Sequence, residues 1–190
     1  MRTALKILAV LIIGVALGLG ATWFTALRGG MSGGLSDGPW RTSLYAGSSQ
    51  GGPYVRANVA AHGLLALNRS ETIYYTATRD SAGRALDGGC AYRLEGRDPP
   101  TRWWSVTAYG PDDFLIPGVG DRYSVSKTSI VRAEDGGWTA EVSTAAAGVN
   151  AIPVKPGPFS LTLRLYNPDP SIAARPAAAR LPTIIREWCT

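Results

Sequence analysis

The stretch Phe159-Ser160-Leu161-Thr162-Leu163-Arg164-Leu165-Tyr166 alternates between large apolar and polar side chains without a break. Successive side chains of a β-strand point to opposite faces, so the leucines share one face with Phe159, and Arg164 shares the other with Tyr166. This pattern fits a strand with one face on a hydrophobic core and one face toward solvent. The stretch therefore predicts a β-sheet protein.

Earlier parts of the chain carry the same signature in shorter form. Segments rich in β-branched and aromatic residues, bounded by Gly, Asp or Pro, occur at 72–78, 90–94, 102–109, 114–116, 129–133 and 137–143. Pro53–Leu67 instead has apolar residues at helical spacing. We expect a mainly β protein: an antiparallel β-sandwich or jelly-roll-like domain, with one N-terminal transmembrane helix and one short amphipathic helix.

A long apolar segment occupies the N-terminus. Residues 7–27 carry no charge, and a helix of this length spans a hydrocarbon core of about 30 Å. Because Arg2 and Lys6 precede the segment, the positive-inside rule predicts a single-pass anchor in a bacterial inner membrane, with the N-terminus cytoplasmic and the C-terminal domain periplasmic. A cleaved signal peptide is the alternative, and it delivers the domain to the same side.

The domain organisation follows from these segments. We expect residues 1–27 to be the transmembrane signal anchor, residues 28–50 to be a flexible Gly-rich linker, and residues 51–190 to be a β-rich periplasmic domain. Cys90 and Cys189 are the only cysteines, and an even number in an oxidising compartment predicts a disulfide between them. Two free thiols remain the alternative. A zinc site is disfavoured because His62 is the sole histidine and structural zinc needs four ligands.

Composition and motifs exclude several classes of function. The formal net charge of +5 is modest and the arginines are scattered, so the chain lacks the clustered basic stripe of a nucleic-acid-binding surface. The Gly-rich stretches lack the Gly-Lys-Ser/Thr ending of a phosphate-binding loop, and we expect no cofactor. The chain also has no Gly-x-Ser-x-Gly elbow, and His62 is expected to flank the apolar stripe of a helix, which disfavours a Ser-His-Asp hydrolase.

Three ordered motifs carry a resemblance to a known family. They are Arg102-Trp103-Trp104-Ser105-Val106-Thr107-Ala108-Tyr109 with Asp113-Phe114-Leu115-Ile116-Pro117, then Asp121-Arg122-Tyr123-Ser124, and Gly157–Tyr166. In these motifs the chain resembles the bacterial family called domain of unknown function 1214, as a short, membrane-anchored member, over roughly residues 70–170. The resemblance implies a β-rich fold and an N-terminal membrane segment, and no established activity. Asp121 stands where the family usually has Asn.

Aromatic residues and arginines gather in these same motifs. If Arg164 and Tyr166 share the solvent face with neighbouring groups, they can line a groove that stacks on sugar rings or holds an anion. The candidate ligand-binding residues are Tyr109, Arg122, Tyr123, Arg164 and Tyr166. The competing interpretation is that the aromatics fill the core and the arginines pair with Asp113, Asp121 or Glu141.

These observations favour a non-enzymatic envelope binding or accessory module, whose partners are the inner membrane through residues 7–27 and either an envelope protein or a carbohydrate ligand. The alternative is a membrane-tethered, glycan-active hydrolase that uses acidic loop residues near Asp112, with Asp113, Asp121 and Glu134 as the other candidates. The sequence determines neither the ligand, nor cleavage of the N-terminal segment, nor the oligomeric state, nor the process served.

Overall fold

A computed structural model of the chain describes residues 2–28, 34–61, 66–117 and 122–189. Its helices are α1 (Arg2–Arg28), α2 (Pro53–Ala61) and α3 (Pro170–Ala174), with a 3-10 turn η2 at Pro176–Ala178. Its strands are β1 (Gly34–Asp37), β2 (Trp40–Ser43), β3 (Thr72–Ala77), β4 (Cys90–Arg97), β5 (Thr101–Tyr109), β6 (Ser124–Ser126), β7 (Gly137–Ser143), β8 (Ala151–Pro153), β9 (Ser160–Pro168) and β10 (Thr183–Cys189).

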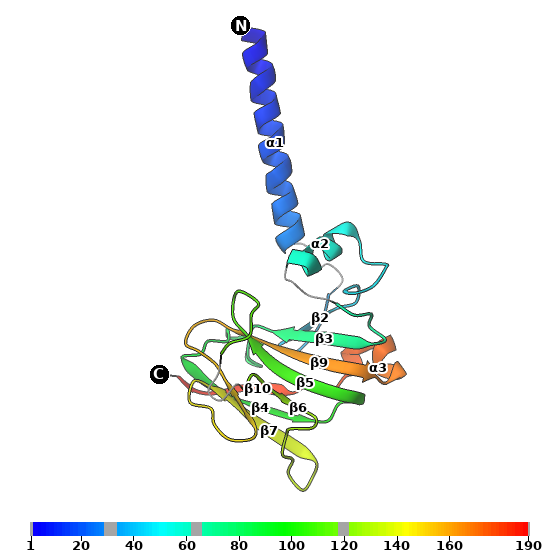
Figure 1. The fold of residues 1–190 in the computed structure, drawn as a ribbon, viewed down its shortest axis with the longest axis vertical. Coiled ribbons are helices and arrows are strands. Elements are labelled where there is room, and N and C mark those ends of the chain that lie inside the picture. The colour runs from blue at the N-terminus through cyan, green and yellow to red at the C-terminus, as the bar shows by residue number, and fades with distance from the viewer. Residues whose placement is uncertain (1, 29–33, 62–65, 118–121, 190) are drawn as a thin grey trace.

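The strands form two sheets that pack face to face. One sheet has the order β1-β2-β3-β9-β5-β6 and the other has the order β10-β4-β7-β8, and all pairs are antiparallel except β7 with β8. The core lies between the sheets, where the rings of Trp104 on β5 and Trp138 on β7 stack with their centroids 5.0 Å apart. Figure 1 shows β3 and β9 on the side nearer α1, with β4 and β7 beyond them. The predicted mainly β, sandwich-like fold is confirmed.

The strand predicted from Phe159–Tyr166, β9, lies in the interior of the six-stranded sheet. β9 pairs with β3 on one side and β5 on the other. Leu161, Leu163 and Leu165 are almost fully buried, while Thr162 and Arg164 lie on the opposite face and are partly exposed. The predicted alternation is therefore the observed one, and it leaves a polar outer face on the sheet.

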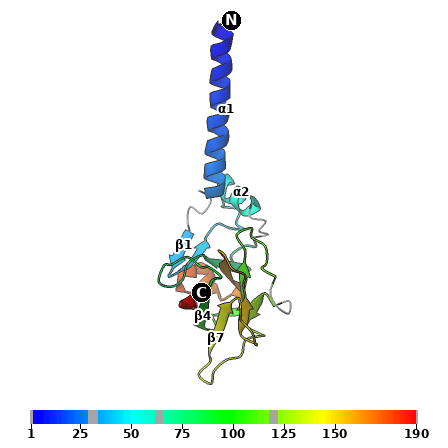
Figure 2. The same cartoon turned by 90° about the vertical axis from the view of Figure 1, so that its left-hand side faces the viewer.

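α1 is long and apolar enough to cross a membrane. The candidate span covers Arg2–Thr25, and none of it is buried against the rest of the protein. Figure 2 shows α1 projecting away from the sheets, with its C-terminal end beside α2, which it contacts. Its exposed apolar side chains are those of a helix that can enter a bilayer, because apolar surface is unfavourable in water.

The segment predicted as the linker 28–50 contains regular structure. β1 and β2 pair with each other, and β2 continues the sheet by pairing with β3. The physical reason is Trp40, which is 1% exposed and donates a hydrogen bond from Nε1 to the carbonyl oxygen of Pro182 at 2.7 Å. This buried aromatic side chain and the pairing of β2 with β3 together hold the segment on the domain.

Three other predicted elements differ from the observed ones. α2 ends at Ala61, and Ala66 and Leu67 are not helical; His62, expected in the same helix, lies outside the described residues. At 114–116 only an isolated bridge forms, between Tyr109 and Leu115. Residues 129–133 form no strand, because the side chain of Asn150 takes the hydrogen bonds of the Val131 backbone N–H at 2.8 Å and carbonyl at 2.7 Å.

The C-terminal strand closes the second sheet at its edge. β10 pairs with β4 from Thr183 to Cys189, and a disulfide joins Cys90 to Cys189 at the end of this ladder. The disulfide expected from the sequence is therefore present in the structure. It joins two positions that are 99 residues apart in the chain.

Candidate functional site

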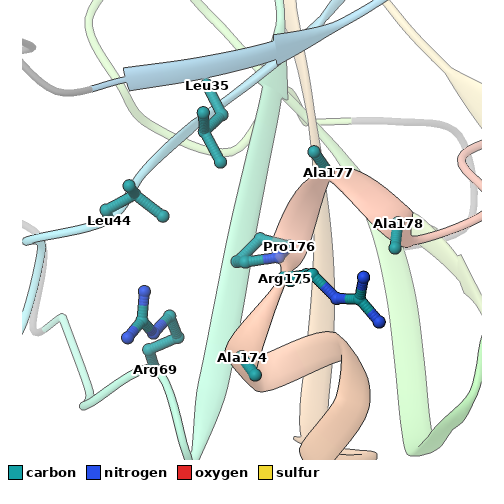
Figure 3. Close-up of a pocket in the computed structure, with 8 residues that line it drawn as sticks. All are labelled: Leu35, Leu44, Arg69, Ala174, Arg175, Pro176, Ala177 and Ala178. Carbon is teal, nitrogen blue, oxygen red and sulfur yellow. The ribbon is translucent and has the colours of Figure 1, made fainter.

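A cavity of about 420 Å³ lies between the β1–β2 hairpin and the turn around α3 and η2, but its chemistry is limited. Its lining residues are Leu35, Leu44, Arg69, Ala174, Arg175, Pro176, Ala177 and Ala178. Figure 3 shows that the guanidinium of Arg175 points away from that of Arg69. The two cations therefore do not converge on a common point, and the remaining walls are apolar.

The larger cavity, of about 620 Å³, lies on the outer face of the six-stranded sheet, and we call it the sheet-face cavity. Its floor comes from β3 and β9, one end comes from β5 and the turn after it, and α2 contributes one residue to the wall. The polar residues that line it are Asn58, Tyr74, Thr76, Thr78, Arg79, Tyr109, Asp113, Ser160, Thr162 and Arg164. This volume is within the range of small-molecule binding sites.

Arg164 is the central charged group of the sheet-face cavity. Its Nη2 donates a hydrogen bond to Tyr109 Oη at 2.6 Å, and its Nη1 donates to Thr107 Oγ1 at 3.5 Å. The guanidinium carbon also lies 5.2 Å from the ring centroid of Tyr109 and 5.9 Å from that of Tyr74. Two aromatic rings, one from each neighbouring strand, thus hold the side chain by cation–π contacts.

A row of hydroxyl groups extends from the arginine along the floor of the cavity. Thr162 lies two residues before Arg164 on the same face of β9, and its Oγ1 is 3.5 Å from Oγ1 of Thr76 on β3. Ser160 and Thr78 add further hydroxyl groups to the lining of the cavity. Hydroxyl groups both donate and accept hydrogen bonds, so this floor can bind a ligand that carries hydroxyl groups of its own.

The acidic candidates do not form a catalytic pair in this cavity. Asp113 lines the cavity in the left-handed backbone region with φ at 63°, which Asp tolerates better than most residues. Asp112 accepts a hydrogen bond from the backbone N–H of Phe114 at 3.2 Å, so it stabilises the turn. Glu134 is exposed in another turn, and Asp121 lies outside the described residues. Among the described lining residues, Asp113 is the single carboxyl group.

The structure brings together two of the five residues that the sequence singled out. Tyr109 and Arg164 meet in the sheet-face cavity. Tyr166 lies further along the face of β9, where its ring packs against Trp103 with centroids 5.2 Å apart. Arg122 is exposed and Tyr123 is partly buried, and neither lines the sheet-face cavity. The competing interpretation paired the arginines with Asp113, Asp121 or Glu141. Among the described residues, Arg164 forms no ion pair with Asp113 or Glu141, and Glu141 accepts a hydrogen bond from Ser143 Oγ at 2.7 Å.

Sequence reasoning missed the contribution of β3. Tyr74 and Thr76 line the cavity because β3 pairs with β9 in the register that sets Tyr74 opposite Arg164 and Thr76 opposite Thr162. The alternation of Thr72–Ala77 identifies their face, but the identity of the neighbouring strand does not follow from it. Asn58 was missed because it lies on α2, whose position over the sheet is a tertiary feature.

Comparison with known proteins gives a family and a fold. The family described as "Protein of unknown function (DUF1214)" matches residues 71–170. No curated protein matches the chain. The crystal structure of the VPA0106 protein from Vibrio parahaemolyticus is similar, with a TM-score of 0.62 and 26% sequence identity over 73% of this chain. An uncharacterised protein from Burkholderia cenocepacia has a TM-score of 0.45 and 16% identity over 90% of the chain.

The two solved proteins are much longer than this chain. The match covers 36% of the Vibrio protein and 41% of the Burkholderia protein. The family match over residues 71–170 includes β3, β5 and β9, which form most of the sheet-face cavity. The cavity therefore lies within the part of the chain that matches the family.

Proposed function

Because the chain belongs to the DUF1214 family, whose description gives no function, we propose a function from its own geometry: a membrane-anchored, non-enzymatic envelope module that binds a carbohydrate or cell-wall ligand in the sheet-face cavity. The observation that carries this proposal is the sheet-face cavity, whose wall combines apolar and aromatic side chains with hydroxyl groups and a guanidinium. Packing of the core does not require a cavity on the outer face of the sheet. A cavity of about 620 Å³ whose lining includes hydroxyls, tyrosine rings and a guanidinium has the chemistry of a carbohydrate site.

The alternative of a glycan hydrolase has less support. Glycoside hydrolysis uses two carboxyl groups about 5 to 10 Å apart, one on each side of the bond that is broken. Asp113 is the only carboxyl group among the described residues of the cavity wall, and Asp112 is engaged in its turn. A single carboxyl beside a guanidinium supports binding better than it supports this reaction.

The place of the cavity supports a role close to the membrane. α2 contacts α1 and also contributes Asn58 to the cavity wall, so the site lies on the side of the domain that is nearer the apolar helix (Figure 1). With Arg2 and Lys6 retained in the cytoplasm, α1 spans the inner membrane and holds the domain on the periplasmic side. The module then samples ligands at the outer surface of that membrane.

A blocking substitution tests the binding site. The full chain is purified in octaethylene glycol monododecyl ether, a neutral detergent without a sugar headgroup, and chitobiose, cellobiose and digalacturonate are titrated by calorimetry. We expect at least one disaccharide to bind, and Thr162→Trp to weaken it at least tenfold by filling the cavity floor. Thr139→Trp is the matched control, because Thr139 is exposed on β7 of the other sheet. Binding of no sugar, or equal binding by Thr162→Trp, contradicts the proposal.

A reporter fusion tests the proposed periplasmic location of the domain. Alkaline phosphatase is active only where its disulfides form, so a fusion after Thr190 is expected to be active in intact cells and to remain with the membrane fraction. Activity of a cytosolic reporter at the same position would place the domain on the other side. Release of the active fusion into the soluble periplasm would mean that the N-terminal segment is cleaved.

A further inference from the structure

Arg164 differs from the arginines of the four-stranded sheet in having no acidic partner. Arg93 lies 2.6 Å from Glu187, Arg97 lies 2.5 Å from Asp135, and Arg186 lies 3.3 Å from Asp80. Within the described part of the chain, no carboxylate lies within ion-pair distance of Arg164. These three arginines of the four-stranded sheet are thus neutralised by carboxylates, whereas Arg164 on the outer face of the six-stranded sheet is not.

The surroundings of Arg164 hold its guanidinium in place without neutralising it. The side chain is half-buried, and a charge that is withdrawn from water loses solvation that only a partner can replace. Tyr109 and Thr107 accept two hydrogen bonds, and the rings of Tyr74 and Tyr109 lie close to the cation. A guanidinium has five N–H donors, so donors remain for a ligand.

The wall of the sheet-face cavity, like Arg164 itself, has a net positive charge. Its charged side chains are Arg79, Arg164 and Asp113, so two positive groups face one negative group and the wall has a net charge of +1. Arg79 donates a hydrogen bond to the carbonyl of Gly83 at 2.9 Å and has no carboxylate partner among the described residues. A ligand with one negative charge would balance the wall.

We propose that the ligand of the sheet-face cavity is an acidic sugar unit, with its carboxylate bound by Arg164 and its hydroxyl groups bound by the floor at Thr76 and Thr162. This inference rests on the proposed function and narrows it to one ligand class. A guanidinium matches a carboxylate with two parallel hydrogen bonds, which no neutral sugar can accept in the same way. The hydroxyl floor begins two residues from Arg164, so one ligand can reach both.

The test compares an acidic ligand with its neutral ester, in which a methyl ester group replaces each carboxylate. Digalacturonate and its methyl ester are titrated into the full chain in octaethylene glycol monododecyl ether. A charge-assisted hydrogen bond in a partly buried site corresponds to about 10- to 100-fold in affinity, so we expect the acid to bind more tightly than the ester by that factor. Arg164→Gln is expected to abolish the difference, and Arg164→Lys to retain a part of it, since lysine keeps the charge without the planar fork.

Controls separate the role of Arg164 from its effect on folding. Arg102→Gln removes an exposed arginine of β5 that does not line the cavity, and it is expected to leave the discrimination unchanged. Thermal unfolding of each variant is measured in the same detergent, and Arg164→Lys provides the comparison if Arg164→Gln is unstable. An acid preference that persists in both Arg164 variants would overturn the assignment.

The outcomes distinguish this inference from the function on which it rests. Equal binding of the acid and the ester would overturn the acidic-sugar inference and leave a carbohydrate module. Binding of chitobiose or cellobiose alone would overturn the inference and leave the proposed function, whereas binding of none of the sugars would contradict both. In that case dihexanoylphosphatidylglycerol, compared with dihexanoylphosphatidylcholine, shows whether the guanidinium binds an anionic lipid headgroup instead of a glycan.

Discussion

The disulfide between Cys90 and Cys189 allows a prediction of its contribution to stability. The perturbation is the double substitution Cys90→Ala and Cys189→Ala. The bond closes a loop of 99 residues, for which the chain-entropy model gives about 4.7 kcal/mol of stabilisation through the unfolded state. β10 remains hydrogen-bonded to β4 without the bond, so the native contacts persist and the loss comes mainly from the larger entropy of the unfolded chain.

We expect a loss of about 3 to 5 kcal/mol in the free energy of unfolding, which for a domain of this size corresponds to a decrease of roughly 10 to 15 °C in Tm. The assay is urea unfolding of the full chain in neutral detergent, followed by the fluorescence of the buried Trp104 and Trp138. A reducing agent is expected to destabilise the wild type equally and to leave the double variant unchanged. A loss below about 1 kcal/mol, or an effect of the reducing agent on the double variant, would refute the argument.

Two further predictions concern positions that tie distant segments to the fold. Burial opposes ionisation of Asp80, but hydrogen bonds from Arg84 and the charge of Arg84 outweigh it and lower the pKa of this carboxyl. The folded-state pKa is thus below the unfolded value of about 3.9, so ionised Asp80 stabilises the fold above that pH, and this stabilisation is lost as the pH falls. Asp80→Asn is expected to lower the free energy of unfolding by about 3 kcal/mol at pH 7, measured by urea unfolding. The difference in stability between the variant and the wild type is expected to close as the pH falls below about 4. In the same assay, Trp40→Ala is expected to lower the free energy of unfolding by about 3 to 5 kcal/mol and Trp40→Phe by about 1 kcal/mol, because Trp40 is buried and donates a hydrogen bond to Pro182. If neither substitution changes the stability, residues 34–43 act as a flexible linker and not as part of the folded domain.

The features predicted from the sequence are those that depend on local periodicity. Alternation over Phe159–Tyr166 identified the core face of β9, because a strand has only two faces and the leucines occupy one of them. The apolar run of α1 was equally clear, since length and composition alone decide whether a helix can cross a bilayer. The two cysteines needed no geometry, because they were the only pair in the chain.

The features that the sequence did not predict depend on contacts between distant segments. β1 and β2 lie in a Gly-rich stretch whose composition indicates flexibility, and contacts with distant segments order it. These are the hydrogen bond of Trp40 to a residue 142 positions away and the pairing of β2 with β3. β6 and β8 have three residues each, too few for a period to be visible. At 129–133 the composition favoured a strand, but the side chain of Asn150 replaced the partner strand.

Two of the five candidate residues singled out from the sequence line the sheet-face cavity, and the reason is related. Motif grouping along the chain selected Tyr109 and Arg164, and these two do meet. It also selected Tyr166, which lies on the correct face but one step too far along β9, and it did not select Tyr74, which belongs to another strand. Which strands are neighbours is fixed by the topology of the sheet, and one sequence does not reveal that topology.

Residues Phe159–Tyr166, mostly in β9, contribute to both the core and the candidate site, and the interior position of β9 in the sheet explains why. An edge strand has one neighbour, whereas β9 has β3 and β5, so Arg164 receives one aromatic ring from each side. A shift of one residue in the register would move the leucines to the outer face and Arg164 into the core. The burial of Leu161, Leu163 and Leu165 opposes that shift, and so the hydrophobic energy of the core also holds the guanidinium at the cavity. A site built in this way has its geometry fixed before any ligand arrives, which favours selective binding over adaptation.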